Sequence, residues 1–188
     1  MICGGYSMRQ EDVSKRDPHL PKYFFVTAGK ALSPVSELNA FDEALMNAGI
    51  AQCNLVPVSS ILPADAVEVD FVPITPGAIV FTIMARIEGS EGDSISAGVA
   101  WSFGVSEEYG RYGIVVEAYG KVNKEELKDE LIRKLLRMAE VRKMDLEEIK
   151  VKIESIERIP KGMYGSVIAA VIFVPTVDYH KVKRKLYV

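Results

Sequence analysis

The segment 93–105, DSISAGVAWSFGV, constrains the fold most strongly, because large apolar side chains alternate along it with small ones. Ile95, Val99, Trp101 and Phe103 fall on one face, and serine, glycine and alanine fall on the other. Alternation with a period of two predicts a β-strand. A small second face indicates a sheet that is covered on both surfaces, by a second sheet or by helices.

Four further segments are predicted to be strands. Residues 77–89 form a nearly continuous apolar run, and residues 111–122 follow the first strand after a charged turn. Residues 164–174 give a late strand, and residues 23–29 give a short early one that Gly29 closes. Such runs, bounded by turn-forming residues, are typical of strands in a packed sheet.

Two segments are predicted to be helices. The first runs from Asn39, which can act as its N-cap, to Gly49, which stops it. The second runs from Asn123 to about Met144, and Asn123 with Glu126 has the form of a capping box. Strands, a long helix and then another strand, without regular alternation, predict an α+β fold and not a doubly wound sheet.

Composition excludes several classes of function. A chain of 188 residues suits one domain, which we expect at residues 21–188 after a polar arm at residues 1–20. The net charge of -3 argues against a nucleic-acid surface, which needs a concentrated basic face. The basic residues after 180 are interpreted as a solvated tail or a last strand.

Cofactor and membrane signals are also missing from the sequence. Cys3 and Cys53 are too few for a disulfide framework or a zinc site, and His19 and His180 are interpreted as surface residues. There is no phosphate-binding loop or dinucleotide fingerprint. No run approaches the roughly 18 apolar residues of a membrane-spanning helix. We therefore expect a cytoplasmic protein with no metal and no soluble cofactor.

The segment 54–65, NLVPVSSILPAD, contains an adjacent serine pair, Ser59 and Ser60, just after an apolar run. Such a pair usually forms a turn. The alternative is self-cleavage, in which a serine hydroxyl attacks the preceding carbonyl, elimination from the resulting ester cuts the chain, and hydrolysis leaves a pyruvoyl group. A pyruvoyl group forms a Schiff base with an amine and accepts electrons. The two serines alone leave both interpretations open.

The segment 38–63, LNAFDEALMNAGIAQCNLVPVSSILP, resembles the archaeal pyruvoyl-dependent arginine decarboxylases. The similarity extends to GIVVEAYGK at 113–121 and to IESI and GSVIAAVIFV at 153–174, and covers about residues 20–174. It implies decarboxylation of L-arginine to agmatine and carbon dioxide, the first step of a polyamine route. It also implies a four-layer αββα sandwich, as in pyruvoyl-dependent histidine and arginine decarboxylases, and a trimer or dimer of trimers with sites between neighbours.

The resemblance also implies roles for individual residues. Cleavage would fall between Ser59 and Ser60, giving chains 1–59 and 60–188, and Ser60 would become a covalent pyruvoyl cofactor in place of pyridoxal phosphate. Asn54 matches a position that supports self-cleavage. The remaining matches concern the substrate: Asp42 receives the guanidinium, Glu117 is the proton donor, and Leu38 and Leu45 line the substrate channel.

The residues themselves support these roles less strongly. Glu117 interrupts the apolar run IVVEAY, where burial would raise its pKa and keep it protonated, but a strand-edge glutamate facing solvent fits the pattern equally well. Asp42 on a helix edge also fits an ordinary exposed carboxylate. Two other functions stay open, a pyruvoyl decarboxylase acting on another cationic amino acid and a non-catalytic trimeric binding or regulatory paralogue.

Overall fold

The computed structural model describes residues 19–182, so most of the predicted arm and the last six residues lie outside the described part of the chain. Two helices and ten strands follow one another along it, with a short 3-10 helix at the end. They are β1 (Tyr23–Ser33), α1 (Glu37–Asn47), β2 (Asn54–Pro57), β3 (Ile61–Leu62), β4 (Val67–Glu68), β5 (Ile79–Ser90), β6 (Ile95–Ser106), β7 (Gly110–Gly120), α2 (Lys124–Val141), β8 (Met144–Leu146), β9 (Lys150–Ile156), β10 (Tyr164–Phe173) and η2 (Thr176–Lys181).

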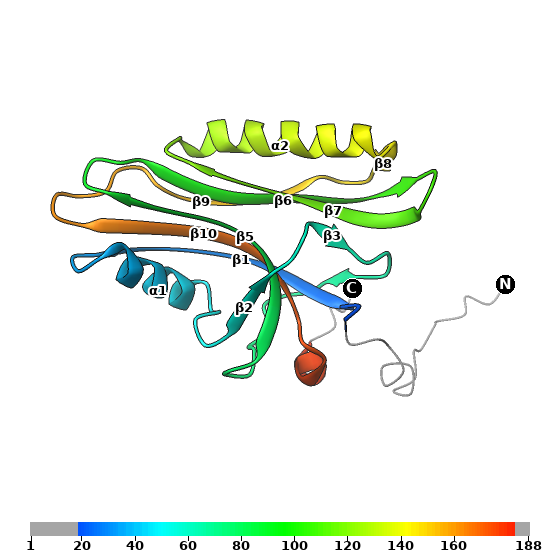
Figure 1. Ribbon diagram of the computed structural model, residues 1–188, viewed down its shortest axis with the longest axis horizontal. Coiled ribbons are helices and arrows are strands. Elements are labelled where there is room, and N and C mark those ends of the chain that lie inside the picture. The colour runs from blue at the N-terminus through cyan, green and yellow to red at the C-terminus, as the bar shows by residue number, and fades with distance from the viewer. Residues whose placement is uncertain (1–18, 183–188) are drawn as a thin grey trace, which may run out of the picture.

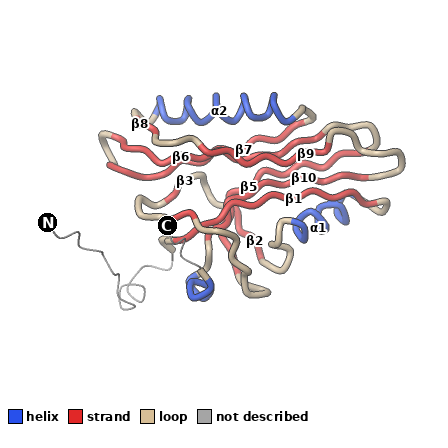
Figure 2. Tube along the Cα trace, turned by 180° about the vertical axis from the view of Figure 1, so that it is seen from behind, coloured by secondary structure: helices blue, strands red, loops and turns tan. Residues whose placement is uncertain are grey.

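The strands form two sheets that face each other (Figures 1 and 2). Sheet A has the order β2-β5-β10-β1-β4, with β2 parallel to β5 and β4 parallel to β1. Sheet B has the order β3-β7-β6-β8, and β9 also pairs with β6. Helix α1 packs against sheet A and α2 against sheet B. The predicted α+β class is therefore confirmed.

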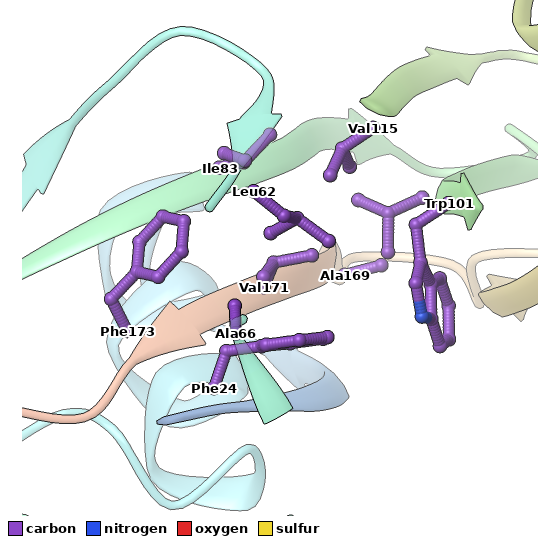
Figure 3. Packing of buried hydrophobic residues seen from close by; sticks show 10 residues of the cluster. Phe24, Leu62, Ala66, Ile83, Trp101, Val115, Ala169, Val171 and Phe173 are labelled. Carbon is purple, nitrogen blue, oxygen red and sulfur yellow. The ribbon is translucent and has the colours of Figure 1, made fainter. Parts of the chain in front are cut away.

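The main core lies between the sheets and is drawn from both of them (Figure 3). Phe24, Ile83 and Val171 come from sheet A, and Trp101 and Val115 come from sheet B. Strand β6 is buried on its second face as well, where its small residues lie under α2. The predicted covering of this strand on both surfaces is therefore confirmed.

The local signals around α1 were partly misread from the sequence. The N-cap is Ser36, whose side chain accepts a hydrogen bond from the Asn39 N–H at 3.2 Å, so Asn39 lies inside the helix. Gly49 has a φ of 77° and follows the helix as predicted. Gly29 does not close its strand, because β1 continues to Ser33. It lies where α1 crosses β1, and the helix backbone comes too close for a side chain.

We expect Gly29→Ala to lower the free energy of unfolding by about 1–3 kcal/mol, the usual cost of overpacking. A Cβ at this position would lie 2.8 Å from the Ala48 nitrogen and closer still to the Ala44 carbonyl oxygen, so α1 would have to move. Gly120→Ala is the matched control, because its Cβ would meet only Val122, at 3.5 Å. Urea unfolding of both variants measures the difference, and equal stabilities would contradict the packing argument.

The capping box at the start of α2 is confirmed, since Asn123 accepts from the Glu126 N–H at 2.9 Å and Glu126 accepts from the Asn123 N–H. The helix ends at Val141, and Met144 begins β8 instead of closing the helix. Strand β9, at Lys150–Ile156, was not predicted. Within residues 19–182, no helix is both long and apolar enough to cross a membrane.

Candidate functional site

The serine pair lies in the connection that passes from one sheet to the other. On its N-terminal side, the Val58 N–H donates to the carbonyl of Thr82 in sheet A, at 3.0 Å. On its C-terminal side, the Ser60 carbonyl accepts from the Val115 N–H of sheet B, at 2.9 Å. The Ser59–Ser60 peptide bond therefore spans the two sheets and is held by backbone hydrogen bonds on both sides.

The carbonyl group of this bond has a hydrogen-bond donor in place. The Ser59 carbonyl oxygen accepts from the Ile61 N–H at 2.9 Å, across a turn of three residues. Ser59 is exposed and Ser60 is half-buried. A nucleophilic hydroxyl thus follows directly after a polarised carbonyl, which is the arrangement that an acyl shift within the chain requires.

Glu117 lies near Ser60 on the same sheet. It is paired with Val99 in the β6–β7 register and therefore points towards sheet A, as Val99 and Val115 do. The hydrogen bond from Val115 extends the β3–β7 ladder to Ser60, which lies diagonally across from Glu117. Such diagonal neighbours are about 7–8 Å apart, within reach of a long side chain.

The environment of Glu117 changes its acidity. Its side chain reaches solvent at the open edge of β7, so it is less buried than its apolar neighbours Val116 and Ala118. The surrounding protein atoms still desolvate the carboxylate and raise its pKa, and the positive charge of Lys134 partly opposes that rise. The shift has the predicted direction, while the exposed position at a strand edge is the alternative that the sequence left open.

The predicted substrate-binding residues lie on the other side of sheet A. Helix α1 packs on the face of sheet A that points away from sheet B. Asp42 is exposed on this helix, Leu38 is 70% exposed, and Leu45 packs partly against the sheet. Sheet A therefore separates this group from Glu117 within one protomer.

Asn54 lies at the start of β2 and belongs to neither group, because its neighbour Leu55 packs on the α1 side of sheet A and side chains alternate along a strand. Its side-chain amide donates to the Gly77 carbonyl at 2.9 Å, at the start of β2. A strand rises about 3.3 Å per residue, so Ser59, five residues later, is at most about 16 Å away. The other residues named from the sequence form two half-sites, one with Ser59, Ser60 and Glu117, and one with Asp42, Leu38 and Leu45.

A pocket of about 340 Å³ opens beside Ser59. Its walls are mostly apolar and come from Val58, Ile61, Phe81 and Phe173, with residues 19–21 on another side. Such a pocket gives a small molecule access to Ser59. Its walls come from both sheets and from the residues just before β1, so spacing along the sequence does not reveal it.

Sequence reasoning also missed Arg111, which holds the segment after the serine pair. Its guanidinium donates to the Ala64 carbonyl and to both carboxylate oxygens of Glu147, at 2.8 and 3.2 Å. These bonds lower the pKa of Glu147. The guanidinium also lies over the Phe103 ring, 4.4 Å from its centre. The chain just after β3 is therefore fixed to sheet B independently of the residues before it.

A second missed residue is Asp178, a fully buried carboxylate in η2. It accepts hydrogen bonds from the Thr75 N–H at 3.0 Å and the Thr75 hydroxyl at 2.6 Å, and pairs with Lys181 at 2.7 Å. These partners lower its pKa against the opposing effect of burial. Lys181 is therefore held against the folded domain by an ion pair, whereas the sequence was interpreted as a solvated tail or a last strand from this point. The basic residues from 183 onwards lie outside the described range.

Comparison with known proteins identifies the family. Residues 23–178 match the family model of pyruvoyl-dependent arginine decarboxylase. A relative of that name from Methanothermobacter thermautotrophicus is 36% identical over 151 residues, which cover 79% of this chain and 93% of the relative. Relatives of the same name from Pyrococcus abyssi and Thermococcus kodakarensis are 39% identical over 144 residues and 35% identical over 157 residues.

These two alignments cover 74% and 82% of this chain and 87% and 96% of the relatives. The match to the family model includes α1, the serine pair, β7 and Asp178, so it contains both half-sites. The chain belongs to the pyruvoyl-dependent arginine decarboxylase family.

Proposed function

We propose that this protein decarboxylates L-arginine to agmatine and carbon dioxide with a pyruvoyl group that it makes from Ser60. The observation that carries the proposal is the Ser59–Ser60 bond, which spans the two sheets beside a pocket, in a chain of this family. The residues around Ser60 are suited to forming a pyruvoyl group. Ser60 follows a carbonyl that already accepts a hydrogen bond, and backbone hydrogen bonds to the two sheets fix the segments before and after it.

Self-cleavage begins when the Ser60 hydroxyl oxygen bonds to the Ser59 carbonyl carbon. The carbon–nitrogen bond then breaks, the Ser60 nitrogen takes up a proton, and an ester joins the two residues. Elimination releases Ser59 as a carboxylate and leaves dehydroalanine at position 60, and water converts this to the ketone with loss of ammonia. Thr82 keeps the first chain in place, while β7 and Arg111 keep the second.

The pyruvoyl group supplies a ketone that takes the substrate amine and accepts the electrons released with carbon dioxide. The protein's own residues do the rest. Glu117, whose pKa is raised by desolvation, is the proposed donor of the proton to the former α-carbon. The apolar walls of the pocket at Phe81 and Phe173 limit access of water to the site.

The second half-site supports substrate binding by a neighbouring copy. We propose that Asp42 binds the guanidinium through a charge-assisted pair of hydrogen bonds, that Leu38 and Leu45 line the channel, and that Asn54 supports processing. Because sheet A separates Asp42 from Glu117, a complete site needs α1 of one protomer beside β7 of another. Exposed apolar side chains on α1, at Leu38 and Met46, suit such an interface.

The assembly that joins the half-sites is proposed to be a trimer, or a dimer of trimers. Each protomer would form a single decarboxylase domain at residues 21–188, in the four-layer αββα arrangement of pyruvoyl-dependent histidine and arginine decarboxylases. Two helices on opposite sides of two facing sheets support that arrangement. Light scattering should give three or six times the 20.8 kDa chain mass. A monomer that is active at high dilution would contradict the shared site.

We expect Asp42→Asn to reduce kcat/KM for arginine by roughly 10- to 100-fold, mainly through KM, since a charged partner of the guanidinium is lost. The matched control is Glu43→Gln, which removes the adjacent exposed carboxylate of α1 and should leave both constants unchanged. Initial rates of agmatine formation measure the effect. An equal loss in the two variants would assign the effect to the general charge of the helix.

The activity itself is tested with carboxyl-labelled arginine, lysine and ornithine. Purified protein should release labelled carbon dioxide fastest from arginine and form agmatine in equal amount. Faster release from lysine or ornithine would favour a decarboxylase for another cationic amino acid. An uncleaved chain that releases nothing from any of them would favour the non-catalytic binding or regulatory paralogue.

A further inference from the structure

The turn at the serine pair leaves one backbone N–H pointing at the bond to be cut. Ile61 is paired with Ile114, and the hydrogen bond from Val115 to the Ser60 carbonyl makes this a non-hydrogen-bonded pair of the antiparallel ladder. The Ile61 N–H therefore points away from β7. It donates instead to the Ser59 carbonyl oxygen, at 2.9 Å.

The hydrogen bond belongs to a three-residue turn centred on Ser60. The central residue, Ser60, has a negative φ, because Lys143 is the one residue other than glycine in the described part of the chain with a positive φ. The turn is therefore the common inverse γ-turn. The chain on both sides of the turn is held in place, because the Val58 N–H donates a hydrogen bond to sheet A and the Ser60 carbonyl accepts one from sheet B. The donor is thus held in position before any reaction begins.

The first step of self-cleavage places negative charge on the oxygen that this N–H contacts. When the Ser60 hydroxyl oxygen bonds to the Ser59 carbonyl carbon, the electron pair of the carbon–oxygen double bond moves onto the Ser59 oxygen. A hydrogen bond to an anionic oxygen is stronger than one to a neutral carbonyl. The donor therefore stabilises the tetrahedral state more than the starting peptide, which is the condition for catalysis.

We propose that the backbone N–H of Ile61 is an oxyanion donor for self-cleavage, an inference that rests on the proposed function. Asn54 of the same protomer does not fill this role, because its amide is bonded to Gly77 at the far end of β2. The Ile61 side chain is not required. Any residue with an N–H at position 61 should support cleavage, and one without it should not.

The test replaces the Ile61 N–H with an ester oxygen, by inserting the α-hydroxy acid analogue of isoleucine at position 61 during cell-free translation. The Ser60 carbonyl then becomes an ester carbonyl and a weaker acceptor for the Val115 N–H. Loss of one oxyanion donor should slow cleavage about 10²- to 10³-fold. Isoleucine inserted at position 61 by the same route keeps the N–H and should cleave at the normal rate. The ester analogue at Leu62 is the structural control, because Leu62 pairs with Gly113 and its N–H belongs to the ladder.

Cleavage of each newly made full-length chain is followed by intact mass against time, and thermal unfolding checks that each precursor folds. Selective slowing in the Ile61 ester supports the donor role. Similar slowing in both esters would assign the effect to weakened strand pairing and overturn it, as would normal cleavage in the Ile61 ester. If the unmodified chain is not cleaved at all, the proposed function fails together with this inference.

Discussion

Ser60→Ala is expected to leave the chain whole and to abolish arginine decarboxylation. The substitution removes the hydroxyl that attacks the Ser59 carbonyl, so neither the ester nor the ketone can form. Denaturing electrophoresis should show one band for this variant, and two fragments, residues 1–59 and 60–188, for the unmodified protein. Intact mass should show that the larger fragment begins with a pyruvoyl group and not with serine.

The loss should not come from unfolding. Ser60 contributes its carbonyl to the ladder with Val115, and alanine keeps that bond. The melting temperature of the variant should therefore stay close to that of an unprocessed precursor. Ser94→Ala, in the turn before β6, is the matched control and should be cleaved normally. Cleavage of the Ser60 variant at the same bond would show that another group performs the attack.

Signals within a few residues predicted much of the fold. The side chains of Asn123 and Glu126 each accept a hydrogen bond from the backbone N–H of the other residue. This capping box marks the start of α2 through local contacts alone, so the sequence was enough to predict it. Gly29 was misread because a glycine in a strand also signals a turn, whereas here it makes room for a helix that packs across β1. That contact depends on the tertiary structure. Strand β9 had a usable signal, since Val151 and Ile153 alternate with charged residues.

The candidate site was less accessible to sequence reasoning. Ser59 and Ser60 lie just before β3, which pairs with the strand of Glu117, but nothing in the spacing of these three residues indicates that the serine pair passes between two sheets. Asp42 was expected in the same site, and its separation from Glu117 by sheet A follows from strand order, which local patterns do not encode. Arg111 and Asp178 were missed because their partners are 47 and 103 residues away.

Glu117→Gln is expected to reduce turnover of arginine by about 10²- to 10⁴-fold, the usual contribution of a general acid. Glutamine keeps the size of the side chain but has no acidic proton to give to the former α-carbon. Because Glu117 takes no part in the attack by Ser60, the variant should still be cleaved into two fragments. A variant that remains whole would instead place Glu117 in processing.

The pH dependence of turnover gives a second test of the same role. If the protonated form of Glu117 is active, turnover falls as the pH rises through its raised pKa. Lys134 holds that pKa down, so Lys134→Met should raise it further and move the falling limb of the profile to higher pH. Lys128→Met removes an exposed charge from the same helix and serves as the control. Turnover that rises instead of falling through this pKa would show that the ionised carboxylate, and not the acid, is the active form.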